Sequence, residues 1–200
     1  MLKVGLTGGL ASGKSFVGRA LAERGCYLIK ADDIGREVMA PGGEAFDAVV
    51  REFGQEILAL DGSIDRKRLA GEVFDDPQRL AALNRLVHPP VIRRQDRMME
   101  EIGARDPHAI VVSEAAVMIE AGSHRRMDKL ILAVCAEEQQ LERATERGGL
   151  SRAEALARIR RQMPLEEKRR YADYVIDTSG AEAETLRQVE EVYNLLQSLS

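Results

Sequence analysis

Short hydrophobic runs separated by helical patterns extend along the chain. Leu2, Val4 and Leu6 precede a glycine pair, which is typical of a buried strand that enters a tight turn, and a helical pattern then runs from Phe16 to Arg24. Four more strands are predicted at residues 27–29, 110–112, 130–134 and 174–176. Because these runs are nearly continuous in apolar residues, we expect an α/β fold in which helices cover both faces of a five-stranded parallel sheet.

About 80 residues separate the second and third predicted strands, far more than one crossover helix needs. Helix patterns in this stretch lie at residues 45–53, after Asp65 and from Asp76-Pro77 onward, whereas Pro89-Pro90 is expected to break or kink the chain. Nearer the C-terminus, Ser151 and Glu154 have the spacing of a capping box, and residues 186–196 predict a last amphipathic helix. The pattern therefore predicts a helical insertion within the α/β core.

Composition adds the class of protein. Two hundred residues, 44% hydrophobic and 31% charged, suit one compact domain. The net charge of −4 gives no overall basic field that would recruit nucleic acid or an anionic membrane. Cys26 and Cys135 lie far apart in apolar surroundings, so neither a disulfide framework nor a zinc cluster is suggested, and a cytoplasmic location is expected. No targeting segment or membrane span is predicted, and nothing indicates an obligatory protein partner.

The glycine-rich turn after the first strand carries the strongest chemical signal. Residues 8–15, GGLASGKS, satisfy G-x-x-x-x-G-K-[ST] between a predicted strand and a predicted helix, the setting that a phosphate-binding P-loop requires. Glycines let successive backbone N–H groups converge, and the helix adds its positive dipole end. Lys14 is expected to reach the β- and γ-phosphates, and the Ser15 hydroxyl to occupy one coordination position of Mg²⁺, so ATP with Mg²⁺ is the predicted ligand.

A second basic region follows the fourth predicted strand. Residues 143–170 hold nine Arg or Lys against four Glu, a net charge of +5 in a chain whose total is −4. One interpretation is a solvated helix face with Glu–Arg pairs. The other is a lid that closes over the nucleotide, brings arginines to the phosphates and hinges at Gly148-Gly149.

Asp32 and Asp33 follow the second strand, at the edge where open α/β sheets bind ligands. An ionised carboxylate there can accept the proton of a hydroxyl that attacks the γ-phosphate. The alternative is that both residues cap a helix that begins near Ile34. His88 could hydrogen-bond a phosphate or pantetheine group of the acceptor, or be a structural or surface histidine.

Several motifs in order give the chain a close resemblance, over nearly its full length, to the dephospho-coenzyme A kinase family. The matching segments are Leu6-Thr7-Gly8-Gly9, Lys14-Ser15, Ala31-Asp32, Ile34-Gly35-Arg36, Leu86-Val87-His88-Pro89 and residues 172–180, ADYVIDTSG. The resemblance implies a P-loop kinase core that transfers phosphate from ATP to the ribose 3′-hydroxyl of dephospho-CoA, giving CoA and ADP in the last step of coenzyme A synthesis. Its implied partners are therefore small-molecule substrates.

The resemblance also implies roles for individual residues. Asp32, Lys14 and Arg143 are the expected catalytic residues, Asp32, Arg36 and His88 the acceptor-binding ones, and Ser15 the metal ligand. The expected nucleotide-binding residues are Gly8, Gly9, Ala11, Ser12, Gly13, Lys14, Ser15, Phe16 and Arg147. The implied domain is single: a core of residues 1–34, 109–142 and 171–200, an acceptor-binding helical insertion at about 35–108 and a lid at about 143–170. The loop of residues 178–180 is expected to border adenine.

The chain departs from the family pattern at a few positions. Lys30 stands where the family often has aspartate, Ala11 where it often has glycine, and Phe16 where Thr or Ser usually follows Lys-Ser. Residues 114–120, EAAVMIE, replace a segment that often reads Pro-Leu-Leu, and Glu120 receives no role. The alternative functions are another nucleoside-monophosphate-type small-molecule kinase and a non-catalytic nucleotide switch; no N-K-x-D guanine signature occurs.

Overall fold

The computed structural model describes residues 1–74 and 76–200, and only the backbone at Phe74, Arg147 and Gly148. The chain divides into two compact units. The first comprises Met1–Lys30 and Ile102–Ser200, and the second comprises Ala31–Glu101. This helical second unit begins a few residues before the start of the insertion predicted at about 35–108, and it ends a few residues before the end of that insertion.

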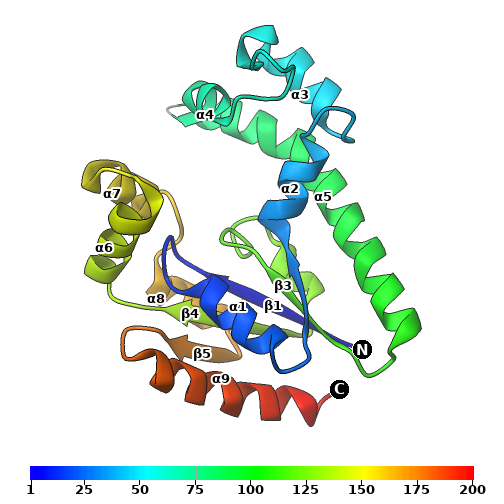
Figure 1. Cartoon of the computed structure of the whole chain (residues 1–200), viewed down its shortest axis with the longest axis vertical. Coiled ribbons are helices and arrows are strands. Elements are labelled where there is room, and N and C mark those ends of the chain that lie inside the picture. The colour runs from blue at the N-terminus through cyan, green and yellow to red at the C-terminus, as the bar shows by residue number, and fades with distance from the viewer. Residues whose placement is uncertain (75) are drawn as a thin grey trace. The chain divides into compact units, whose positions relative to one another are not determined.

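A parallel sheet of five strands forms the centre of the first unit (Figure 1). Its strands are β1 (Leu2–Gly8), β2 (Tyr27–Lys30), β3 (Ile110–Glu114), β4 (Lys129–Val134) and β5 (Tyr174–Asp177), in the spatial order β2-β3-β1-β4-β5. All four strand pairs are parallel, which confirms the predicted sheet. Because β1 pairs with strands on both sides, the glycine-rich turn that follows it leaves from the middle of the sheet.

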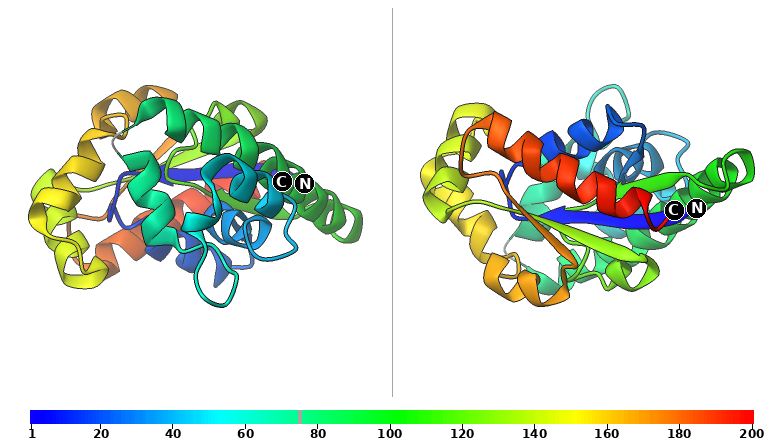
Figure 2. Two further views of the ribbon diagram at one scale, coloured as in Figure 1. Left: turned by 90° about the horizontal axis from the view of Figure 1, so that it is seen from above. Right: turned by 90° about the horizontal axis from the view of Figure 1, so that it is seen from below.

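Helices α1 (Lys14–Ala22) and α9 (Glu182–Gln197) pack on one face of this sheet. Val17 and Leu21 of α1 and Val189 and Leu196 of α9 join the buried side chains of the strands in one hydrophobic core. In Figure 2, α9 lies alongside the strands and both chain termini lie at the same end of the unit. The other face is covered by a smaller cluster that contains Met118, Ile119 and Leu130.

Helices α6 (Glu137–Gly148) and α7 (Arg152–Arg160) form a packed pair within the region predicted as a lid. Leu141 and Ala144 of α6 are buried against Ala155 of α7. The predicted capping box is confirmed, because Ser151 and Glu154 exchange side-chain and backbone hydrogen bonds at the start of α7. A short helix, α8 (Leu165–Lys168), and the turns η2 (Ser123–Arg126) and η3 (Arg169–Tyr171) complete the unit.

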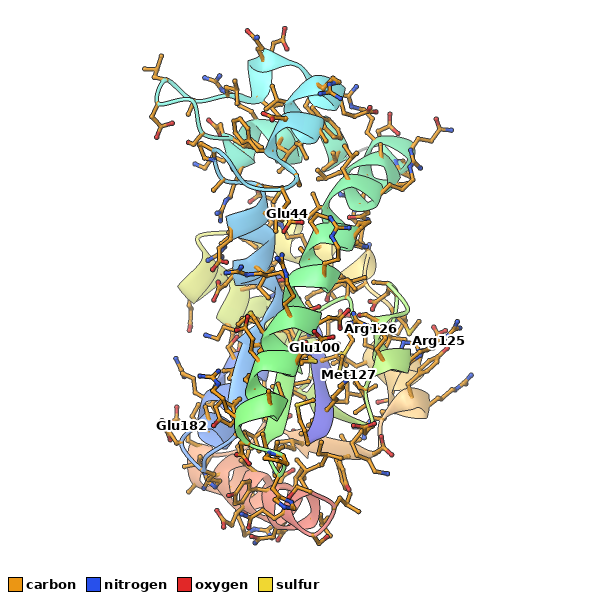
Figure 3. All side chains as sticks on the ribbon, turned by 90° about the vertical axis from the view of Figure 1, so that its right-hand side faces the viewer. Glu44, Glu100, Arg125, Arg126, Met127 and Glu182 are labelled. Carbon is orange, nitrogen blue, oxygen red and sulfur yellow. The ribbon has the colours of Figure 1, made fainter. Side chains whose placement is uncertain are left out.

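The second unit contains α2 (Ala31–Val38), α3 (Phe46–Phe53), the turn η1 (Gln55–Ile57), α4 (Arg66–Phe74) and most of α5 (Pro77–Arg105). The helix starts predicted at Asp65 and Asp76 are confirmed, since the side chain of each accepts hydrogen bonds from two backbone amides of the following turn. Glu44, labelled in Figure 3, accepts hydrogen bonds from Arg93 and Arg97 of α5.

Of the break or kink expected at Pro89-Pro90, the break is wrong, because α5 continues through both prolines to Arg105, and the kink stays a prediction. A proline ring removes one backbone donor and crowds the preceding turn. In a helix of 29 residues, the remaining hydrogen bonds and the burial of Pro90 compensate for two missing donors. Over the described ranges, no helix is long and apolar enough to cross a membrane.

Candidate active site

The glycine-rich loop is held tightly between β1 and α1 in the first unit. A side chain at Gly8 would meet the Ser12 Oγ at 2.3 Å and the Ala133 carbonyl oxygen at 2.7 Å. Gly13 has a φ of +83° and lies so close to Thr178 that a Cβ would approach its Oγ1 to 2.7 Å. Only glycine fits both positions, so these two residues of the motif are required by the packing of the loop itself.

Several backbone amides of this loop lack an internal acceptor. The N–H groups of Ala11, Gly13, Lys14 and Ser15 form no hydrogen bond to any described residue, whereas that of Phe16 donates to the Gly13 carbonyl at 2.9 Å. Unpaired amides at the start of a helix, together with the helix dipole, form an anion-binding site. The loop can therefore bind phosphate oxygens through its main chain.

A cavity of about 680 Å³ opens beside these amides. It is lined by the loop, by α6 and α7, and by the segment from the end of β5 into α9: Leu10, Ala11, Ser12, Gly13, Lys14, Ser15, Phe16, Arg19, Arg143, Ala144, Leu150, Arg158, Thr178, Gly180, Glu182 and Thr185. All of these residues belong to the first unit. The volume is of the size that holds a nucleotide-sized ligand.

Ser15 contacts an acidic residue that sequence analysis left without a role. Its Oγ donates a hydrogen bond of 2.6 Å to Oε1 of Glu114, the last residue of β3. Glu114 is buried, and its Oε2 has no partner among the described residues. A hydroxyl and a carboxylate with a free oxygen are the hard oxygen donors that Mg²⁺ prefers, so these two residues fit the metal that the motif predicts.

Arginines on α6, α7 and α1 supply positive charge to the cavity. Arg143 of α6 donates hydrogen bonds to the Thr178 Oγ1 at 3.1 Å and to the Thr178 carbonyl oxygen at 2.7 Å. Arg158 of α7 and Arg19 of α1 also line the cavity. Arg143 is therefore anchored to the segment after β5 while its guanidinium remains at the cavity wall.

Two loop positions that depart from the family pattern take part in the same wall. Ala11 has a φ of +53°, the one non-glycine residue in the described chain with a positive φ. The methyl group thus occupies a left-handed conformation that glycine adopts at lower cost. Phe16 follows Ser15 in the first turn of α1 and lines the cavity.

The expected acceptor-side residues belong to the second unit. Asp32 and Asp33 lie in the first turn of α2, which begins at Ala31 directly after β2, so the alternative of a helix capped near Ile34 is wrong. The Asp33 carboxylate pairs with Arg36 at 3.3 Å, whereas Asp32 has no partner among the residues that the structure describes. His88 lies partly buried within α5, and burial lowers its pKa.

The structure thus brings together the loop residues 8–16 and Arg143 in one unit. The Arg147 side chain lies outside the described part of the chain, so its nucleotide contact stays a prediction. Sequence analysis missed Glu114, Arg19 and Arg158 as site residues. The position of Glu114 at the end of a buried strand next to β1 was an available signal, whereas Arg19 and Arg158 resemble ordinary helix-surface arginines until the helices are placed.

Comparisons with known proteins agree with this geometry. The model of the dephospho-CoA kinase family matches residues 2–184. A dephospho-CoA kinase of Carboxydothermus hydrogenoformans is 43% identical over 186 residues, which cover 93% of this chain and 90% of that protein.

Solved structures are similar over the whole chain. One from Thermus thermophilus is 34% identical, covers 100% of this chain and 98% of its own, and has a TM-score of 0.83. A dephospho-CoA kinase from Campylobacter jejuni shares the fold with a TM-score of 0.63 at 23% identity, covering 96% of each chain. The P-loop, the parallel order of the strands and these matches together place the chain in the dephospho-CoA kinase family.

Proposed function

We propose that this protein transfers the γ-phosphoryl group of ATP to the ribose 3′-hydroxyl of dephospho-CoA, giving CoA and ADP. The observation that carries the proposal is the row of unpaired amides at Ala11, Gly13, Lys14 and Ser15, which opens into a nucleotide-sized cavity. Family membership supplies the acceptor, because a P-loop by itself identifies only a nucleotide-binding protein.

The chain's own groups bind and orient the triphosphate. Loop amides and the N-terminus of α1 donate hydrogen bonds to the phosphate oxygens, and Lys14 adds a point charge near the group that is transferred. Arg143, Arg158 and Arg19 add charge from the cavity wall. Phosphoryl transfer depends mainly on such positioning and charge stabilisation, so this arrangement is suited to it.

Mg²⁺ would be held by Ser15, with Glu114 beside it. When bound, the ion neutralises charge on the phosphates and orients them. Glu114 accepts a hydrogen bond from the Ser15 hydroxyl and so fixes the direction of the Ser15 oxygen. Gly18 of α1 supports this contact, since a Cβ there would come within 3.2 Å of the Glu114 Oε2.

On the acceptor side, we assign Asp32 as the group that takes the proton of the attacking hydroxyl. Asp33, its neighbour, is already paired with Arg36, which leaves the Asp32 carboxylate as the free one of the two. Arg36 and His88 are assigned to binding of dephospho-CoA, and Arg147 to the nucleotide, on the family motifs that they match. The buried free thiols of Cys26 and Cys135 suit a reducing compartment, and a cytoplasmic location stays a prediction.

Comparison of acceptors tests the proposal. ADP release is measured with dephospho-CoA, AMP, CMP, adenosine and shikimate at equal concentrations, and CoA formation is followed separately. Dephospho-CoA alone is expected to give rapid turnover. Faster turnover with a nucleoside monophosphate or shikimate would assign the protein to a different small-molecule kinase, and ADP release that no acceptor accelerates would reject a phosphotransferase.

A further inference from the structure

Lys168, the last residue of α8, is a buried cation that the proposed reaction does not use. Its side chain is fully buried. Its Nζ donates hydrogen bonds to the carbonyl oxygens of Ala116 at 2.7 Å and Gly8 at 3.4 Å, and it pairs with the Glu120 Oε1 at 2.9 Å. One ammonium group therefore connects α8, the end of β1 and the segment after β3.

The same contacts extend to the base of the lid. The Glu120 Oε1 also accepts a hydrogen bond from the Met163 amide at 3.0 Å. One residue earlier, Gln162 accepts the Leu10 amide at 2.8 Å, and Gln140 of α6 donates to the Leu10 carbonyl oxygen at 2.7 Å. The glycine-rich loop is thus held from outside at Gly8 and at Leu10.

These anchors determine which way the neighbouring amides face. In a trans peptide unit the C=O and the N–H point in opposite directions. A Gly8 carbonyl held by Lys168 therefore turns the Gly9 N–H away from Lys168, and a Leu10 carbonyl held by Gln140 turns the Ala11 N–H away from Gln140. Lys168 thus fixes the peptide unit at the start of the loop, and Gln140 fixes the unit that carries the Ala11 amide, one of the four left for phosphate oxygens.

A buried ammonium is a poor choice for stability alone. Burial lowers the pKa of Lys168, the Glu120 carboxylate raises it, and the nearby Lys14 lowers it again. Buried ion pairs can often be replaced by apolar side chains without loss of stability. The Lys168 ammonium, however, donates hydrogen bonds to two main-chain carbonyls, and an apolar side chain could not do so.

We propose that Lys168 is a positioning residue for the phosphate site, which holds the Gly8 carbonyl and thereby orients the amides of the glycine-rich loop. It acts through the loop and touches no ligand itself, because its side chain is enclosed. The inference rests on the proposed function only in taking the loop as the phosphate site.

The test uses ADP affinity, which does not depend on the acceptor or on turnover. In Lys168→Met, loss of a charge-assisted hydrogen bond behind the loop is expected to weaken ADP binding by about ten- to a hundredfold in calorimetry. A matched control is Lys129→Met, which removes a half-exposed lysine paired with Asp173 on the same unit and is expected to leave ADP affinity unchanged.

A double variant separates positioning from charge balance. Lys168→Met with Glu120→Gln contains no unpaired buried charge and keeps an acceptor for the Met163 amide, so it is expected to unfold near the wild-type temperature and still bind ADP weakly. Wild-type ADP affinity in this double variant would overturn the proposal, because the lysine would then serve only to neutralise Glu120. If the wild type binds ADP but does not phosphorylate dephospho-CoA, the proposed function fails and this test remains valid.

Discussion

Two neighbouring carboxylates at the start of α2 have different surroundings. Asp33 pairs with Arg36, and Asp32 is unpaired among the described side chains. Asp32→Asn is expected to lower kcat by roughly 10²-fold or more, the usual effect of removing a general base, and to change the affinity for ATP only a few-fold. Initial rates and calorimetry measure the two quantities. Asp33→Asn is the control, and an equal loss of kcat in both variants would contradict the assignment of Asp32.

Glu114 directs the Ser15 hydroxyl through a hydrogen bond of 2.6 Å. Glu114→Gln keeps the shape of the side chain but removes its charge beside the expected Mg²⁺. Residues that orient a metal ligand typically change metal affinity by about 10–100-fold, so binding of Mn²⁺ to the ADP complex is expected to weaken by this amount in electron spin resonance titrations. Glu138→Gln, a change to an exposed pair with Arg152, is the control. Unchanged Mn²⁺ affinity in Glu114→Gln would remove Glu114 from the metal site.

His88 gives the free energy of unfolding a dependence on pH. Burial lowers its pKa below the usual 6.5, so the unfolded chain binds its proton at a higher pH than the folded protein does. The unfolded state binds more protons in the window from 6.5 down to the lowered value, and the free energy of unfolding therefore falls as the pH drops through that window. Urea unfolding at several pH values is expected to show a shallower fall in His88→Gln. An equally steep fall in His88→Gln and in the wild type would show that His88 does not cause this dependence.

Individual site residues could be predicted from the sequence where one local motif determines the chemistry. Gly8, Gly13, Lys14 and Ser15 could be predicted because their spacing describes a single turn. Glu114 and Lys168 could not be assigned, because their contacts with the loop, at Ser15 and Gly8, join residues 99 and 160 positions apart in the chain. Only the register of β3 with β1, and the position of α8, bring those groups to the loop.

Among the elements, α7 depends on its first turn. The helix has nine residues, and one of them, Ala155, is fully buried, so little packing supports it. Ser151→Ala removes the capping box and is expected to destabilise the helix by about 1 kcal/mol. Hydrogen exchange of the amides in α7 should become correspondingly faster, while exchange in α1 stays the same. Unchanged exchange in α7 would show that its contacts with α6 alone determine its stability.

The strands and the helix caps could be predicted from the sequence, whereas the length of α5 could not. The central strands are short, apolar and bounded by polar residues, and Ser151, Asp65 and Asp76 act on amides within three residues of themselves. Pro89 and Pro90 also act locally, but the outcome there depends on the rest of α5, whose 29 residues supply many further hydrogen bonds. The two prolines therefore do not end α5, because the helix is long enough to keep most of its hydrogen bonds.

For the whole molecule, nucleotide binding should be visible in thermal unfolding. A ligand at a hundred times its Kd adds about 2.7 kcal/mol to the stability of the folded state, which in a protein of this size corresponds to roughly 5–10 °C. Differential scanning calorimetry with ADP is expected to show this increase. Lys14→Ala should largely abolish it, and an equal increase in that variant would place ADP away from the glycine-rich loop.

A long helical stretch between two strands was predictable, because about 80 residues exceed any single crossover. The second unit begins at Ala31 and ends within α5, so one helix belongs to both units. Because the helix continues across the boundary, secondary structure does not change there, and the nearby Gly103 lies inside α5.

The central position of β1 also has a consequence for synthesis on the ribosome. This strand leaves the exit tunnel before the other four, yet its two neighbours, β3 and β4, begin at Ile110 and Lys129. At translation speeds of about 5–20 residues per second, its edges remain without partners for on the order of ten seconds. An apolar segment that waits so long is a natural client for a ribosome-associated chaperone, and the nucleotide cannot assist folding until most of the polypeptide has emerged.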